Sequence, residues 1–275
     1  MLILVPLFIA ALAPAATPSA PTPPSANPAL LTGYFEMYDL AFDKAHNTFL
    51  DFEQHNPADP LGPASNAAAY LFHEFERLHI LQSELFVDDS AFKHRKKPDP
   101  DPNARRAFDA ELDKSSRLAA AILAHSPNDS NALFATLLGY GLRADYDALV
   151  DKHYLSSLDN LKAGRTLAQQ LLAANPSCYD AYIAIGVENY LLSLKPAPLR
   201  WLLELGGAQA DKDTGIANLR LTAEHGVYLK PYARLLLGIA ALRDHDTATA
   251  RRILLELSHQ FPDNPLYSQE LARLH

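Results

Sequence analysis

The chain has 275 residues, of which 48% are hydrophobic and 20% charged, a composition that excludes disorder for most of its length. Asp and Glu outnumber Lys and Arg by 32 to 24, and the net charge of -8 repels phosphate backbones and anionic lipids, so we expect no nucleic-acid partner. Only 11 glycines are present, while Ala and Leu are abundant, which favours an all-α fold.

The first predicted element is a signal peptide over residues 1–15. Leu2 to Leu12 form an uncharged apolar run, shorter than the roughly 20 residues that a membrane-spanning helix needs. Ala15 ends an Ala-Pro-Ala sequence with small residues at both positions that a signal peptidase reads, so we expect cleavage after it. The mature chain is then expected to be periplasmic or secreted, without a transmembrane segment. Residues 16–29, rich in Pro and Ala, predict an extended linker, and residues 30–275 the folded domain.

One spacing recurs four times along the predicted domain: a small residue, an apolar residue four positions later, and a proline eight positions after that. An Asp or Asn follows each proline. Because the residue before a proline leaves helical geometry and Asp or Asn caps a new helix, each copy predicts a helix end and a restart. The copies are Ala45/Phe49/Pro57 with Asp59, Ser115/Ala119/Pro127 with Asp129, Gly164/Ala168/Pro176 with Asp180, and Ala250/Leu254/Pro262 with Asn264.

The last unit, Pro231 to Asn264, has the fullest pattern. It contains Leu237-Gly238, a small residue twelve positions after that glycine, an apolar Leu254 and the closing Pro262. With these residues the chain resembles the tetratricopeptide repeat family, and its C-terminal third is similar to a divergent group of bacterial members. Leu138-Gly139 and Ile185-Gly186 mark two further first helices. Glycine at these sites predicts a close approach of paired helices.

Two inserts interrupt the repeat spacing. About a dozen extra residues, including 145–154, precede the third copy of the pattern. After the second glycine-marked helix, Pro198 occupies the expected small position, so we predict a short amphipathic turn over 199–205 and a partner helix near 213–225. Either the first insert or residues 195–206 could fill a groove formed by the repeats.

The resemblance implies a right-handed α-solenoid of about five helix pairs, whose first helices line a concave groove. It implies a non-enzymatic scaffold or adaptor in the cell envelope, with no cofactor, that binds a peptide or helix of a partner protein. In the family, groove residues lie six and three positions before each marking glycine and one and four after it. These residues are Leu133, Thr136, Tyr140, Arg143, Asp180, Ile183, Val187, Tyr190, Tyr232, Leu235, Ile239 and Leu242.

A metal-dependent helical-bundle enzyme is the alternative, because Glu76/His79 and Glu256/His259 are two Glu-x-x-His motifs of the kind found in di-iron bundles. The second motif falls on the helix face opposite the apolar residues, which indicates solvent exposure. His73 and His79 are also candidate zinc ligands, because both lie on one predicted helix. Residues six apart on a helix rise about 9 Å and diverge by about 120°, so they do not hold one ion together.

Three other features have simpler interpretations. Cys178 is the only cysteine, cannot form an internal disulfide, and is interpreted as a small buried packing residue. The basic stretch 94–97, within a predicted loop over 88–103, is interpreted as a solvated segment. A third functional hypothesis is a small-molecule sensor, which a closed apolar pocket with a few polar groups would support.

Overall fold

The computed structural model describes residues 26–81, 96–194 and 210–274, and in these ranges the regular segments are all helical. The all-α prediction is therefore confirmed for this part of the chain. The predicted signal peptide, the turn predicted over 199–205 and half of the basic stretch lie outside it. The helices are α1 (Pro28–Tyr38), α2 (Phe42–His55), α3 (Leu61–Arg77), α6 (Pro102–Leu123), α7 (Ser130–Tyr146), a π-helical segment (Asp147–Asp151), α8 (Tyr154–Ala174), a 3-10 turn (Tyr179–Ala181), α9 (Tyr182–Ser193), α11 (Lys212–His225), α12 (Lys230–Arg243), α13 (Thr247–Gln260) and α14 (Pro265–Arg273).

The four predicted helix ends are confirmed. Helices α2, α6, α8 and α13 each stop two to four residues before the proline of their repeat. The predicted caps hold at two of the restarts, where Asp129 accepts a hydrogen bond from the amide of Ala132 at 2.9 Å and Asn264 from that of Leu266 at 3.0 Å. The predicted cap at Asp180 is wrong, because this residue lies inside the 3-10 turn and its carboxylate bonds to a distant segment.

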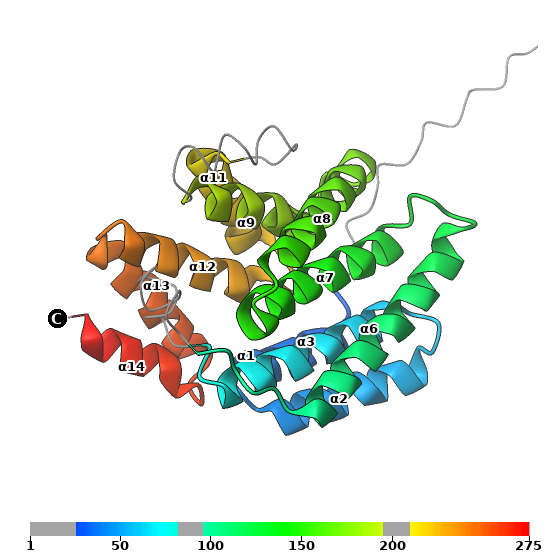
Figure 1. The fold of residues 1–275 in the computed structure, drawn as a ribbon, viewed down its shortest axis with the longest axis horizontal. Helices are drawn as coiled ribbons and strands as arrows, with labels where there is room; N and C mark the ends of the chain where they lie inside the picture. Colours follow the sequence, from blue (N-terminus) through cyan, green and yellow to red (C-terminus); the bar gives the residue numbers. More distant parts are fainter. Residues whose placement is uncertain (1–25, 82–95, 195–209, 275) are drawn as a thin grey trace, which may run out of the picture.

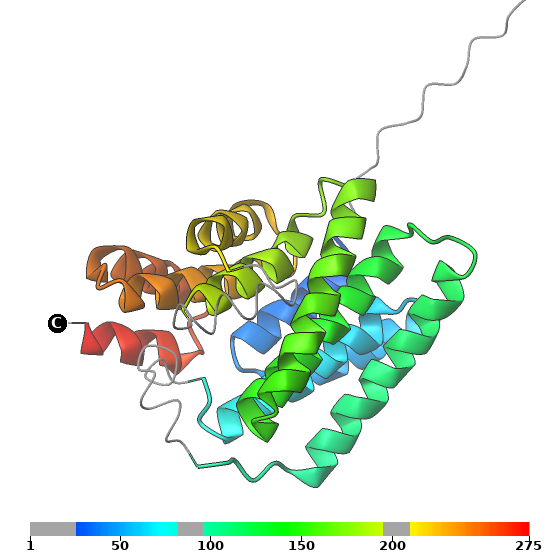
Figure 2. The same ribbon diagram turned by 45° about the horizontal axis from the view of Figure 1, so that its top comes forward.

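Consecutive helices pack on one another along the described chain, from α1 on α2 through to α13 on α14 (Figure 1). The described residues form eleven α-helices. The longest are α6 and α8, with 22 and 21 residues, and Figure 2 shows both along most of their length. The partner helix predicted near 213–225 is confirmed as α11.

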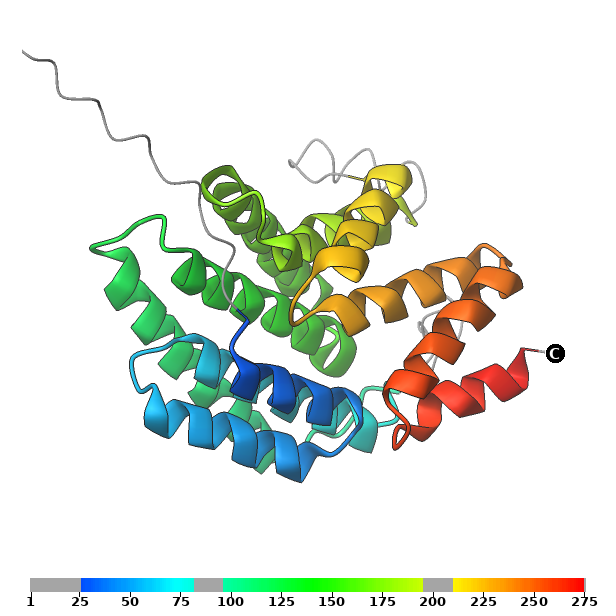
Figure 3. The same ribbon diagram turned by 180° about the vertical axis from the view of Figure 1, so that it is seen from behind.

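Helix α1 also connects the start of the fold to its end (Figure 3). The backbone oxygen of Tyr38 accepts a hydrogen bond from the side-chain amide of Asn264 at 2.8 Å, and Asp39 accepts one from the amide of Asp263 at 2.9 Å. The rings of Phe35 and Phe261 lie 5.2 Å apart between centroids. Packing therefore goes beyond contacts between chain neighbours, because the first helix joins the last repeat.

Helix α3 has an unusually buried first half, since residues 61–69 are all buried. Most of these residues are small, which lets α3 lie in contact with α1, α2, α6 and α7. The polar exceptions have partners: the hydroxyl of Ser65 donates to that of Tyr34 at 3.3 Å, and the amide of Asn66 donates to Glu111 at 3.2 Å. Burial of polar groups at this position is thus matched by hydrogen bonds.

The glycines that mark the first helices differ in how closely their neighbours approach. A Cβ added at Gly186 would lie 2.9 Å from Cγ of Leu219 and 3.1 Å from the backbone oxygen of Gly215, so α9 and α11 touch at the backbone. The predicted close approach is therefore confirmed there. It is wrong at Gly139 and Gly238, where an added Cβ would have its nearest contacts at 3.8 and 3.5 Å, an ordinary van der Waals separation.

Candidate functional site

Two adjoining cavities are lined in part by the helices that the three glycines mark, cavity A by α7, α9 and α12 and cavity B by α12 alone. Cavity A, of about 80 Å³, lies between α1, α3, α7, α8, α9 and α12, and cavity B, of about 60 Å³, between α1, α3, α12, α13 and α14. Both are partly open and mostly apolar. They share four lining residues: Met37, Tyr38, Phe72 and Tyr232.

The polar groups of cavity A centre on Asp145, near the end of α7. The hydroxyl of Tyr232 donates a hydrogen bond to Oδ2 of Asp145 at 3.3 Å, and Asn160 of α8 lines the same cavity. Burial raises the pKa of Asp145 to about 7, against the lowering effect of the Tyr232 hydrogen bond. Burial and the neighbouring carboxyl raise the pKa of Tyr232 well above its usual value, so Tyr232 acts as a neutral donor near pH 7.

Sequence reasoning missed Asp145, although a signal was present. The residue follows Leu142 by three positions and Leu138 by seven, so it continues an apolar stripe of α7. A carboxylate on such a stripe points to a buried titratable group. The repeat spacing instead places residue 145 within an insert, whereas the structure continues α7 to Tyr146.

Six of the predicted groove residues line the two cavities. Ile183 and Val187 line cavity A, Leu235, Ile239 and Leu242 line cavity B, and Tyr232 lines both. The structure therefore brings together six of the eight residues predicted from the second and third glycine-marked helices. Their role in binding a partner stays a prediction.

The residues predicted from the first glycine-marked helix have other surroundings. Leu133 is fully buried, the hydroxyl of Thr136 donates to the backbone oxygen of Ala132 at 2.8 Å, and Tyr140 is half-buried. Arg143 is paired with Asp113 at 3.0 Å. None of the four is among the described residues that line cavity A or B.

Asp180 and Tyr190 are both buried, at 5% exposure each. The carboxylate of Asp180 accepts hydrogen bonds from the amides of Val227, Tyr228 and Leu229 at 2.9 to 3.2 Å, just before α12 begins. Burial raises the pKa of Asp180, while these backbone hydrogen bonds act in the opposite direction. In this structure the carboxylate therefore holds the α11–α12 connection.

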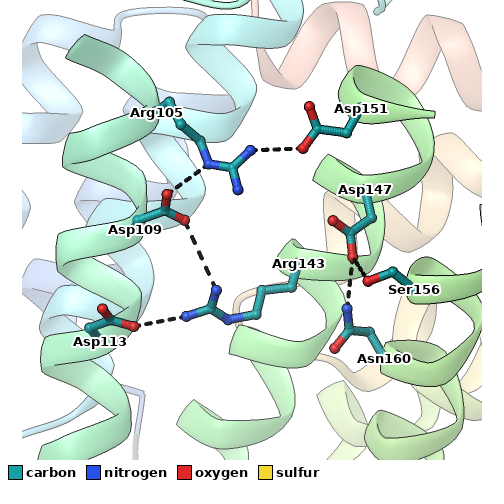
Figure 4. Close-up of polar contacts among 8 residues, drawn as sticks. All are labelled: Arg105, Asp109, Asp113, Arg143, Asp147, Asp151, Ser156 and Asn160. Carbon is teal, nitrogen blue, oxygen red and sulfur yellow. Dashed lines mark hydrogen bonds and ion pairs between the residues drawn. The ribbon is translucent and has the colours of Figure 1, made fainter. Parts of the chain in front are cut away.

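A ladder of alternating charges runs from α6 to the π-helical segment (Figure 4). Arg105 contacts Asp109 at 2.7 Å and Asp151 at 2.8 Å, and Arg143 contacts Asp113 at 3.0 Å and Asp109 at 4.0 Å. The ladder joins α6 to α7 and to the π-helical segment. It explains the position of Arg143 as part of a helix–helix contact.

Next to this ladder, Asp147, Asp151 and His153 offer oxygen and nitrogen atoms within 4.8 Å of one another, a separation compatible with a metal ion. The two carboxylates are engaged by protein donors. Asp151 pairs with Arg105, and Oδ2 of Asp147 accepts a hydrogen bond from the amide of Asn160 at 3.0 Å (Figure 4). Charge neutralisation and hydrogen bonding therefore account for this cluster as a structural contact.

A second polar cluster, which sequence reasoning also missed, joins α2, α3 and α6. Buried Asn66 donates to Glu53 at 3.4 Å and to Glu111 at 3.2 Å, and its amide oxygen lies 2.7 Å from Nδ1 of His46. Lys114 pairs with Glu53. Burial and the neighbouring Glu53 raise the pKa of Glu111 to about 7. The cluster therefore holds a carboxyl with a raised pKa among the helix contacts, and it is separate from the two cavities.

The Glu-x-x-His motifs do not form the geometry that a metal site needs. His79 lies beyond the end of α3 with a positive φ of 56°, so it does not share a helical face with Glu76. Glu256 and His259 are exposed, as predicted, and Glu256 pairs with Arg252 at 2.9 Å. His73 is exposed, and its ring stacks on that of Phe42.

The interpretation of Cys178 as a buried packing residue is confirmed. The side chain is buried, and burial raises the pKa of the thiol to about 12. The thiolate is therefore scarce near neutral pH, and the residue lacks the electropositive surroundings of a reactive cysteine.

Comparisons with other proteins add no constraint on the site. No helix among the described residues combines the length and apolar character needed to cross a membrane. Comparison of the chain with protein-family models, with curated proteins and with solved structures gives no match. Assignment of a function therefore rests on the residues and geometry of this chain.

Proposed function

We propose that this chain is a non-enzymatic scaffold or adaptor of the tetratricopeptide-repeat type, which binds an apolar peptide or helix of a partner protein. The observation that supports this most is the grouping of six predicted groove residues around cavities A and B. Partly open apolar cavities on packed helices accept the large side chains that dominate the affinity of protein interfaces.

In this proposal α7, α9 and α12 are the first helices of a right-handed solenoid, and their inner sides form the groove. Helix α1 packs against part of that surface, since its Tyr34 lines cavity A and its Met37 lines both cavities. The partner segment would therefore occupy the rest of the groove and insert apolar side chains into cavities A and B.

The proposed location is the cell envelope. Its support is the apolar run Leu2 to Leu12 followed by small residues up to Ala15. Mass spectrometry of the protein isolated from its native host tests this proposal. A mature chain beginning at Ala16 in the periplasm or medium would agree with it, and a cytosolic species that retains Met1 would contradict it.

The binding proposal is tested with a groove variant and a matched surface control. The groove variant carries Val187→Ala and Ile239→Ala, one residue from each cavity. The control carries Leu155→Ala, because Leu155 is 81% exposed and lines neither cavity. Proteins captured from a native envelope extract by the unaltered chain are identified, purified and titrated against all three forms.

We expect the groove variant to raise the Kd of a direct partner by about 30-fold, which corresponds to roughly 2 kcal/mol of hot-spot energy. The control is expected to keep the original Kd. Thermal unfolding of each form establishes that the variants are folded. Equal affinity of folded groove variant and control would contradict the proposal.

A further inference from the structure

Cavity A places the carboxyl of Asp145 in a mostly apolar wall. Its described lining residues include no Lys, Arg or His, and the side chain of Asp145 has no ion pair with any described residue. A carboxylate in apolar surroundings is costly unless a cation or several donors compensate its charge. Here the one hydrogen bond to it comes from the neutral Tyr232 hydroxyl at 3.3 Å.

We propose that cavity A binds an alkylammonium group, with the alkyl chain against the apolar wall and the ammonium paired with Asp145. The hydrogen bond from Tyr232 occupies Oδ2 and leaves Oδ1 to accept an N–H of the ligand. Asn160 also lines the cavity, and because its amide NH₂ donates to Asp147, its amide oxygen is the group that can accept a second N–H.

The chemistry of the lining selects against other head groups. A carboxylate or phosphate ligand would be repelled by Asp145, and the lining supplies no cation to offset that repulsion. A neutral alcohol would gain the same apolar contacts but lose the charge-assisted hydrogen bond, which is about twice as strong as a neutral one. A volume of about 80 Å³ limits the buried part of the ligand to a short chain.

Two sources offer this chemistry: a free alkylamine, or a lysine side chain of a bound partner segment. The lysine source rests on the proposed function, since it requires a partner in the groove, whereas the free amine does not. Lysine with both backbone ends capped (Nα-acetyl-lysine N-methylamide), whose side-chain amine is free, therefore serves as a second probe beside n-butylammonium. Tighter binding of capped lysine than of n-butylammonium would indicate a partner lysine, and the reverse order would indicate a free alkylamine.

The test titrates the mature protein with n-butylammonium, n-butanol and butyrate, followed by NMR. We expect n-butylammonium to bind at least tenfold more tightly than n-butanol, and butyrate not to bind. In Asp145→Asn this preference should disappear, while Asp159→Asn, which removes an exposed carboxylate of α8, should retain it. Thermal unfolding of Asp145→Asn and Asp159→Asn shows whether both variants are folded, so that misfolding of the first cannot be taken for loss of the preference.

The dependence on pH gives a further readout. Besides Asp145 of α7, the titratable groups in the lining are Tyr34 and Tyr38 of α1 and Tyr232 of α12, and burial raises the pKa of all three tyrosines. Only Asp145 then changes charge near neutrality, so affinity for n-butylammonium should increase from pH 6 to pH 8.

Equal affinity for n-butylammonium and n-butanol, or an ammonium preference that survives in folded Asp145→Asn, would overturn the inference. Either result leaves the proposed function intact, because that proposal is judged by the groove variant and its partner. Conversely, an ammonium preference without any protein partner would support the inference and contradict the adaptor proposal.

Discussion

The hydroxyl of Tyr232 and the carboxyl of Asp145 meet at 3.3 Å although 87 residues separate them in the chain. This contact joins α7 to α12 across cavity A, and Asp145 is the one carboxyl among the described residues that line the cavity. Because the pKa of the Asp145 carboxyl is raised in the folded chain, the stability of the fold depends on pH.

Stability should fall with rising pH because of Asp145. The pKa of its carboxyl is about 7 in the folded chain, above the ordinary 3.8, so between these values the folded state holds a proton that the unfolded state has released. The stabilisation that comes from binding this proton is fully present below the ordinary pKa of 3.8 and is lost as the pH rises through 7. Urea unfolding from pH 5 to 8 should show that the unfolding free energy of the unaltered chain, minus that of Asp145→Asn, falls by up to about 1.4 kcal/mol per pH unit.

Asp159→Asn controls for the loss of one negative charge in this comparison, since Asp159 is exposed on the neighbouring helix. A difference between the unaltered chain and Asp145→Asn that stays constant from pH 5 to 8 would show that the pKa of Asp145 is not raised in the folded chain.

Asp180 should be among the most sensitive positions for stability. Replacing it by Ala leaves the backbone amides of residues 227–229, two of them buried, without their acceptor, and each unsatisfied buried donor costs about 1–3 kcal/mol. We expect Asp180→Ala to lose about 3 kcal/mol or more in the unfolding free energy and Asp180→Asn to lose less, because one oxygen remains. A loss below about 1 kcal/mol for the Ala variant would refute this account of its role.

Two glycines at the same repeat position should respond in opposite directions to alanine. Gly139→Ala is expected to stabilise the chain by about 1 kcal/mol, since a methyl group fits there and alanine favours a helix. Gly186→Ala should destabilise it by about 1–3 kcal/mol, because the methyl group would press on Leu219 and on the backbone of α11. Chemical unfolding of both variants provides the measurement, and equal signs for the two would disprove the packing difference.

Local sequence patterns predicted the helices and many of their ends, because proline and capping side chains act over a few residues. The fully buried Asn66 and the contact of Tyr38 with Asn264 did not follow from such patterns. They depend on how α1 and α3 pack against helices distant in the chain, and repeat spacing carries no information on that packing. For the same reason, spacing alone could not separate Ile239, which lines cavity B, from buried Asp180.

The most direct test of the groove is photocrosslinking in the native host. A benzophenone amino acid replaces Leu242, which lines cavity B, or Leu155, which is 81% exposed and lines neither cavity. We predict an adduct with one defined protein from position 242 and no such adduct from position 155. Absence of that adduct at 242, or the same adduct at both positions, would contradict the proposed groove.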